Sequence, residues 1–86
     1  MNFNELLKKH SLSRTEGRLK LLETLTKANC PLSEKEIEKM MPAGINKTTI
    51  YRNLNSLSEK GIIQRIISGG SLKYKLNNSL LDNKNS

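Results

Sequence analysis

The residues best suited to chemistry lie between positions 46 and 60, in the segment NKTTIYRNLNSLSEK. Ile50, Leu54 and Leu57 recur there at helical spacing, which predicts an amphipathic helix over 46–60. Asn46 is a suitable N-cap for this helix. If the apolar stripe packs inward, the opposite side of the helix carries polar residues. That side consists of Thr48, Arg52, Asn55 and Glu59, with Tyr51 and Ser56 at its margins.

This polar side has the composition needed to contact DNA. Its hydroxyl, guanidinium and carboxamide groups supply the donors, acceptors and methyl groups that distinguish base edges in a major groove. Lys47 and Thr49 lie in the first turn, where backbone amides and the helix dipole favour a phosphate. An ordinary solvated helix face has a similar composition, so the helix alone leaves both interpretations open.

A basic hairpin is predicted directly after this helix, because apolar and polar residues alternate across 63–76. Gly69 and Gly70 interrupt the alternation and supply the positive φ angles of a tight turn. The side predicted to pack on the core consists of Leu72, Tyr74 and Leu76. Lys73 and Lys75 then face outward. They suit either a phosphate backbone or an edge strand protected from aggregation.

Three shorter amphipathic helices are predicted earlier in the chain. The first spans residues 2–10. The second begins at a capping box formed by Ser13 and Glu16, and the third begins at a second box, formed by Ser33 and Glu36. The expected core positions are Leu19, Leu22 and Leu25 in the second helix, with Leu21 beside them, and Ile37, Met40 and Met41 in the third.

The predicted order is therefore four helices followed by one hairpin. The fold class is α+β and mostly α, a winged helix-turn-helix with an extra N-terminal helix and a C-terminal two-stranded β wing. Residues 1–76 form the expected domain, and residues 77–86 are expected to be a polar tail. In such a fold the helix over 46–60 is the recognition helix. Its place in the order, with a basic wing after it, favours DNA binding over a plain solvated face.

Charge points to the same kind of partner. The 86 residues include 15 Lys and Arg against 8 Asp and Glu, a net charge of +7, which suggests a polyanion. Arg14 and Arg18 form a further basic spot near the start of the second helix. A phosphate contact and an ordinary surface role suit Arg18 equally well.

Composition also excludes several classes of function. The single His and single Cys cannot build a structural zinc site, which needs about four nitrogen or sulfur ligands. The carboxylates form no HExxH or paired pattern and no glycine-rich loop joins a strand to a helix, so we expect no enzyme. No apolar run is long enough to span a membrane, and the lone cysteine favours a cytoplasmic protein.

Four segments of the chain together resemble the DNA-binding half of the ferric uptake regulator (Fur) family. They are LKKHSLSRTEGRLKLLETL, LSEKEIEKM, NKTTIYRNLNSLSEKGII and the Gly-Gly hairpin that ends in YKL. The most specific part is TTIYRNLNSLSEKGII. It is similar without a gap to the family pattern T-[VI]-Y-R-x-L-x-x-[FL]-x-x-x-G-[IL]-[VI].

The resemblance implies a bacterial repressor that is dimeric and binds an AT-rich palindromic operator. It implies that the helix over 46–60 enters the major groove and that the wing over 63–76 lies on the backbone or in the minor groove. It also implies a base contact for Tyr51, with Arg52 and Arg18 on phosphates. With the patterns above, the candidate DNA-binding residues are Arg14, Arg18, Lys47, Thr48, Thr49, Tyr51, Arg52, Asn55, Gly69, Gly70, Lys73 and Lys75.

The resemblance does not reach the family's second domain, which carries the metal ligands and the dimer interface. We therefore expect no cofactor in these 86 residues and a monomer or weak homodimer, with a partner regulator as one option. Two other functions stay open. One is a winged helix that modulates a full-length regulator, with Leu80 and Leu81 as its contact, and the other is a non-specific DNA binder.

Overall fold

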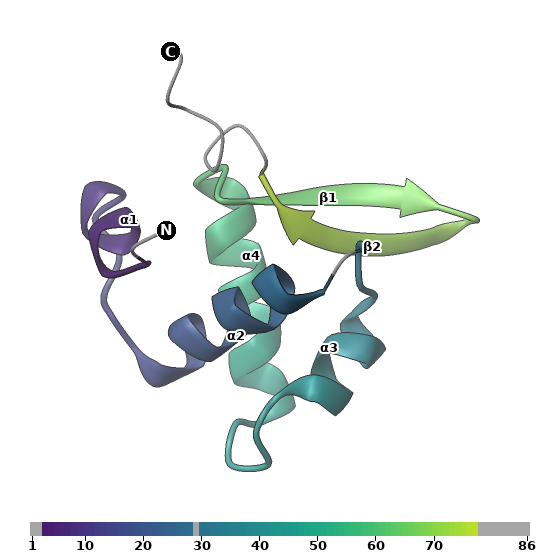
Figure 1. Ribbon diagram of the computed structural model, residues 1–86, viewed down its shortest axis with the longest axis horizontal. Coiled ribbons are helices and arrows are strands. Elements are labelled where there is room, and N and C mark those ends of the chain that lie inside the picture. Colours follow the sequence, from purple (N-terminus) through teal and green to yellow (C-terminus); the bar gives the residue numbers. More distant parts are fainter. Residues whose placement is uncertain (1–2, 29, 78–86) are drawn as a thin grey trace.

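The computed structural model describes residues 3–28 and 30–77, and in this part of the chain four helices precede one antiparallel hairpin (Figure 1). The elements are α1 Phe3–Lys9, α2 Glu16–Lys27, α3 Glu34–Met40, α4 Lys47–Glu59, β1 Ile63–Ser68 and β2 Ser71–Leu76. This order confirms the predicted winged helix-turn-helix with one additional N-terminal helix. Of the predicted tail, only Asn77 belongs to the described residues, and Leu80 and Leu81 lie outside them.

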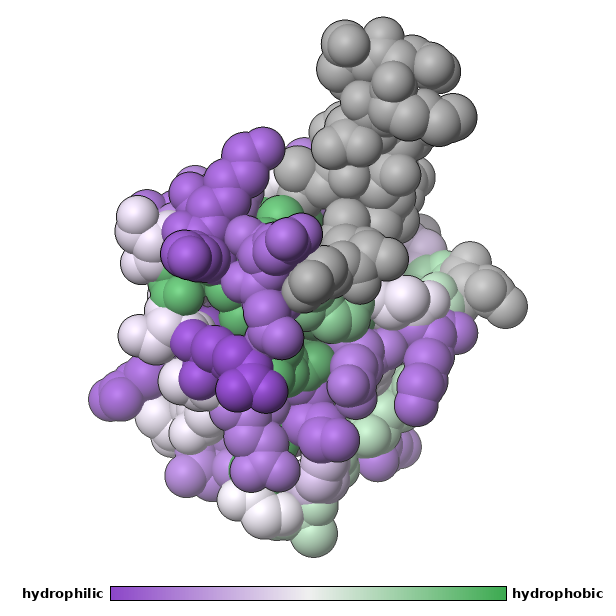
Figure 2. Space-filling model, turned by 60° about the vertical axis from the view of Figure 1, so that its left-hand side comes forward, coloured by the Kyte–Doolittle hydropathy of each residue, from purple (hydrophilic) through white to green (hydrophobic). Residues whose placement is uncertain are grey.

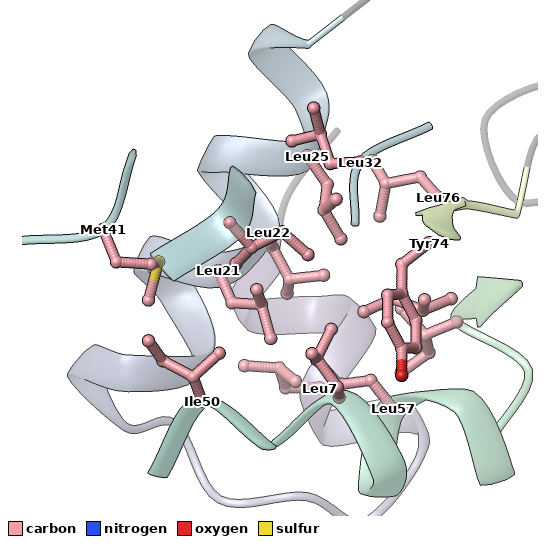
Figure 3. Packing of buried hydrophobic residues seen from close by; sticks show 14 residues of the cluster. Leu7, Leu21, Leu22, Leu25, Leu32, Met41, Ile50, Leu57, Tyr74 and Leu76 are labelled. Atoms are coloured by element: carbon pink, nitrogen blue, oxygen red, sulfur yellow. The ribbon is translucent and has the colours of Figure 1, made fainter. Parts of the chain in front are cut away.

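Helix α4 lies at the centre of the arrangement. In Figure 1, α2 crosses in front of it, α3 lies below the wing, and α1 lies to one side. Apolar side chains from all of these elements meet in one cluster, part of which is shown in Figure 3. Ile50, Leu54 and Leu57 are almost completely buried in it, which confirms the predicted inner stripe of α4. Because each such side chain contributes about 1.5–3 kcal/mol when buried, the stripe determines which side of α4 faces solvent.

The start of α2 differs from the prediction. Thr15, not Ser13, is the N-cap, since its backbone is extended and its side chain accepts a hydrogen bond from the Arg18 backbone N–H at 3.3 Å. Ser13 lies too far before the first helical residue, Glu16, to reach an amide of the first turn. Its backbone carbonyl instead accepts a hydrogen bond from Nη1 of Arg18 at 2.8 Å.

The starts of α3 and α4 agree with the sequence. Ser33 and Glu36 form a reciprocal capping box, with Ser33 N to Glu36 Oε1 at 2.8 Å and Glu36 N to Ser33 Oγ at 3.2 Å. Asn46 caps α4 by accepting from the Thr49 backbone N–H at 2.8 Å. Gly61 follows α4 with a φ of +78°, as expected for a glycine that ends a helix.

Two predicted core positions in the helices differ from the structure. Leu19 packs against the core but is only partly buried, and Leu21 is completely buried, because the face of α2 that packs on α4 and β2 is centred on Leu21, Leu22 and Leu25. Met40 is 50% exposed because it is the last residue of α3. The chain turns extended at Met41, whose side chain enters the core and lies 3.5 Å from Thr24 Oγ1.

The wing pairs β1 with β2 in register from Ile63–Leu76 to Ser68–Ser71, and Gly69 and Gly70 close it with φ angles of +60° and +82°. Tyr74 and Leu76 are buried as predicted, but Leu72 is 43% exposed. Leu72 pairs with Ile67 close to the turn, where the hairpin extends beyond the helices (Figure 1). The base of the wing is joined to Leu32, which exchanges two backbone hydrogen bonds with Tyr74 at 2.7 and 2.9 Å.

Within the described ranges, no helix has the length and apolar character needed to cross a membrane.

Candidate nucleic-acid interface

The outer side of α4 carries the predicted row of polar and aromatic residues. Thr48 and Arg52 are exposed, and Tyr51 keeps 49% of its surface accessible. Asn55 is half-buried at the same side, one turn beyond Arg52. The predicted row of Thr48, Tyr51, Arg52 and Asn55 therefore lies together along α4, opposite the buried stripe.

The first turn of α4 is partly committed to the fold. Lys47 is exposed, so its ammonium group is accessible to an anion. Thr49 is half-buried, and its backbone N–H is taken by Asn46 Oδ1. The side chain of Thr49 is directed toward α2, because a Cβ added at Gly17 would meet Thr49 Cγ2 at 3.2 Å. Of the two first-turn candidates, Lys47 is the one presented to solvent.

The close approach of α2 to α4 depends on Gly17. A Cβ on this buried residue would lie 3.1 Å from Nδ2 of Asn53, which is also buried. The absence of a side chain at Gly17 therefore lets the first turn of α2 rest directly on α4. Sequence patterns did not mark Asn53 as a core residue, because its polar carboxamide interrupts the apolar spacing of the helix.

The lysines of the wing lie on the face opposite Tyr74 and Leu76. Lys73 pairs with Ile66 and Lys75 with Gln64, and both lysines are half-buried. Gly69 and Gly70 are exposed at the tip. The structure thus places Lys73 and Lys75 on the side of the wing away from the core, as predicted, although neither is fully exposed.

Lys73 also lies near the start of α3. The pKa of Glu36 is lowered from its ordinary value, chiefly because the Ser33 backbone N–H donates to this carboxylate, with smaller contributions from the Ser33 side chain and the positive charge of Lys73. The ammonium of Lys73 is thus close enough to act on α3 electrostatically. The wing and the first helix of the helix-turn-helix share this part of the surface.

The basic spot before α2 contains two different arginines. Arg14 is exposed, so its guanidinium is accessible. Arg18 is half-buried and donates to the Ser13 carbonyl, which holds the segment between α1 and α2 against the helix. Arg14 is therefore the accessible arginine of the two, whereas Arg18 makes a hydrogen bond within the fold.

Sequence reasoning missed Arg65. This exposed residue of β1 donates from Nη2 to Oδ1 of Asn55 at 2.8 Å, which connects the wing to the outer side of α4. A signal was present in the sequence, since Arg65 is the polar member of the alternating set that also contains Ile63 and Ile67. A cation at a position whose neighbours in the pattern are apolar indicates an interaction with an adjacent element.

Hydrophilic side chains cover most of the face shown in Figure 2, with apolar residues visible between them. In residues 3–28 and 30–77, no group of three or more His, Cys, Asp or Glu side chains could hold a metal ion. Cys30 is exposed and forms no disulfide in this part of the chain.

Comparison with known proteins gives one consistent result. The model of the ferric uptake regulator family matches residues 9–84 of this chain. The ferric uptake regulation protein of Staphylococcus epidermidis (strain ATCC 12228 / FDA PCI 1200) is 32% identical over 82 residues, covering 88% of this chain and 59% of that protein.

Two solved structures are also similar. The ferric uptake regulator of Pseudomonas aeruginosa with manganese has a TM-score of 0.79 at 31% identity, covering 92% of this chain and 63% of that one. The ferric uptake regulator of Vibrio cholerae, whose crystal structure reveals a rearrangement of its DNA-binding domains, has a TM-score of 0.75 at 34% identity. That comparison covers 87% of this chain and 61% of the Vibrio cholerae chain. The chain thus spans about three fifths of the length of the relatives it matches.

Proposed function

The chain belongs to the ferric uptake regulator family, and from this we propose that it binds double-stranded DNA sequence-specifically as part of a transcriptional regulator. The observation that carries the proposal is the outer side of α4. Thr48, Tyr51 and Arg52 project from it, opposite a stripe that is fully packed into the core. The packing leaves this side of the helix rigid and accessible, as a reader of base edges must be.

The dimensions of α4 suit the major groove. A helix with its side chains is about 10–12 Å across, and the major groove of B-DNA is about 12 Å wide. In this arrangement Tyr51 contacts bases, and Arg52 and Lys47 neutralise phosphates at the edges of the groove. The wing, with Lys73 and Lys75, then lies on the adjacent backbone or in the minor groove.

The proposed target is an AT-rich inverted repeat. Helix-turn-helix proteins bind such repeats as two copies, each with its recognition helix in one half-site. Occupation of a promoter by the protein would lower transcription, so the proposed regulatory effect is repression. The function is one of binding and requires no catalytic group.

A metal ion does not fit the described residues. The Pseudomonas aeruginosa relative was determined with manganese, but residues 3–28 and 30–77 of this chain group no three side chains of the types that ligate metals.

Salt dependence tests the phosphate contacts. Arg14, Lys47, Arg52, Lys73 and Lys75 are the five candidate cations at the proposed interface. If all five neutralise phosphates, the slope of log affinity against log salt should be about −4.5 for each bound copy, and Arg52→Glu should make it shallower by about 0.9 per copy. The probe is an AT-rich palindromic duplex of about two helical turns, with fluorescence anisotropy as the readout.

Lys27→Glu is the matched control, because it makes the same change of charge on α2, which covers the buried side of α4. It should leave affinity nearly unchanged after correction for net charge. Equal losses for Arg52→Glu and Lys27→Glu would show that α4 has no special place in binding. A slope near zero for the wild-type protein would refute phosphate contact altogether.

Tyr51 tests sequence specificity. Tyr51→Ala should reduce the ratio of affinities for the palindrome and for a scrambled duplex of the same composition. Tyr51 is half-exposed and outside the core, so the free energy of unfolding should change little in this variant. An unchanged ratio would remove Tyr51 from base recognition, and a wild-type ratio near one would indicate a non-specific DNA binder.

A further inference from the structure

A side-chain hydrogen bond joins the proposed recognition helix to the wing. Nη2 of Arg65 in β1 donates to Oδ1 of Asn55 in α4 at 2.8 Å. Both residues are accessible from outside, since Arg65 is exposed and Asn55 half-buried. The contact is therefore at the edge of the proposed interface and outside the apolar core.

The chemistry of Arg65 determines how the Asn55 carboxamide is oriented. A guanidinium has five N–H donors and no acceptor, whereas a carboxamide has an oxygen that accepts and an NH2 group that donates. The oxygen of Asn55 must therefore be the atom that faces Arg65. The NH2 group, on the other branch of the same planar amide, is directed elsewhere.

The backbone of Arg65 is held firmly enough to act as an anchor. Arg65 pairs across the hairpin with Tyr74, which is buried and is itself hydrogen-bonded to Leu32. The next residue toward the base on the same face, Ile63, is buried as well. The guanidinium thus extends from the fixed base of the wing, not from its tip.

We propose that Arg65 is a positioning residue that fixes Asn55 as a hydrogen-bond donor to the bases. The proposal rests on the DNA-binding function proposed above and makes it more specific. An Asn that reads adenine in the bidentate mode uses both its oxygen and its nitrogen. With the oxygen turned to Arg65, Asn55 offers N–H groups to acceptors in the major groove, which are purine N7, guanine O6 and thymine O4.

The test uses matched variants of both residues. Asn55→Ala removes the base contact, and Arg65→Met removes the donor while keeping an unbranched side chain. Arg65→Lys keeps a positive charge and a donor. Each variant and the double variant Asn55→Ala/Arg65→Met are titrated with the AT-rich palindromic duplex and with its scrambled counterpart, and thermal unfolding is recorded for all.

A positioning role predicts coupled losses. Asn55→Ala and Arg65→Met should each lower the palindrome-to-scramble affinity ratio by about tenfold, and the double variant should lower it no further. Arg65→Lys should recover most of the ratio. Unfolding midpoints should stay close to the wild-type value, because the contact is exposed.

Other outcomes overturn the proposal. If Arg65→Met weakens binding to both duplexes equally, and its effect adds to that of Asn55→Ala, then Arg65 is an independent phosphate contact. If Arg65→Met instead lowers the unfolding midpoint and leaves the ratio unchanged, the pair is only structural. A wild-type protein that does not distinguish the two duplexes would refute the DNA-binding specificity itself, which separates that failure from failure of the Arg65 assignment.

Discussion

Replacing the N-cap of α4 should destabilise the protein by about 1 kcal/mol. Asn46 has an extended backbone, with φ −82° and ψ 165°, and its Oδ1 accepts from the Thr49 N–H at 2.8 Å. Replacing a cap of this kind with Ala costs about 0.5–2 kcal/mol. Asn46 is exposed, so water can take over part of the lost hydrogen bond in Asn46→Ala. The expected cost therefore lies in the middle of the range.

A change of this size is measurable in such a small protein. With a urea dependence of about 1 kcal/mol per molar, the midpoint followed by circular dichroism should fall by about 1 M. The thermal midpoint should fall by about 4–8 °C. DNA affinity should fall only modestly at temperatures where the protein stays folded, because the residues on the outer side of α4 are unchanged.

Asn46→Asp separates folding from binding. Aspartate keeps the acceptor, and its charge at a helix N-terminus is favourable by about 0.3–1 kcal/mol, so stability should be kept or raised. The same charge would lie near the phosphates and should weaken DNA binding. If Asp and Ala destabilise equally, or if Ala leaves the midpoint unchanged, then the hydrogen bond to Thr49 does not stabilise the start of α4.

Three further predictions concern the core, the capping box and the wing. Leu54 is fully buried, so Leu54→Ala should cost about 2–5 kcal/mol, and a loss below about 1 kcal/mol in a urea titration would contradict that packing. Hydrogen bonding from Ser33 lowers the pKa of Glu36 below its ordinary value of 4.5. The ionised Glu36 side chain should therefore contribute its full stabilisation of the fold above pH 4.5, and this stabilisation should be lost as the pH falls through the lowered pKa. Glu36→Gln should reduce the fall of the thermal unfolding midpoint at acid pH. An unchanged fall in this variant would argue against a contribution of the ionised Glu36 to stability. Gly70 has a φ of +82°, so Gly70→Ala should cost about 1–2 kcal/mol in thermal unfolding. Gly69→Asn suits the first position of such a turn and should be neutral, and equal effects of the two variants would contradict the turn geometry.

Features set by neighbouring residues were predictable from the sequence. The caps at Ser33 and Asn46 each depend on a side chain that reaches an amide three residues ahead. The turn at Gly69 and Gly70 depends on local φ angles. The buried stripe of α4 follows from helical spacing alone. Most of the candidate interface is placed by that stripe, since the outer side of the helix is simply the side opposite.

Features set by distant elements were not predictable. Leu72 follows the alternation of a buried strand but lies past the end of the helices, so nothing covers it fully. Met40 fits the apolar spacing of α3, yet the helix ends at that residue. The alternation in the sequence marks Arg65 as unusual, but its bond to Asn55 depends on how the wing is set against α4, so the partner could not be predicted locally. Such positions require knowledge of which elements meet.

Two backbone hydrogen bonds join Leu32 to Tyr74, and we expect them to make the base of the wing open less readily than its tip. All of α3, α4 and β1 lie between these residues in the chain, so forming the contact closes a long loop whose entropy is repaid only when the whole fold assembles. The amide of Tyr74 should accordingly exchange its hydrogen only through openings close to global unfolding, whereas those at Gly69 and Gly70 should exchange through local fraying. The base of the hairpin is then expected to be rigid and its tip mobile. Its tip can follow variations in groove width on the timescale of loop motions while the base holds its register.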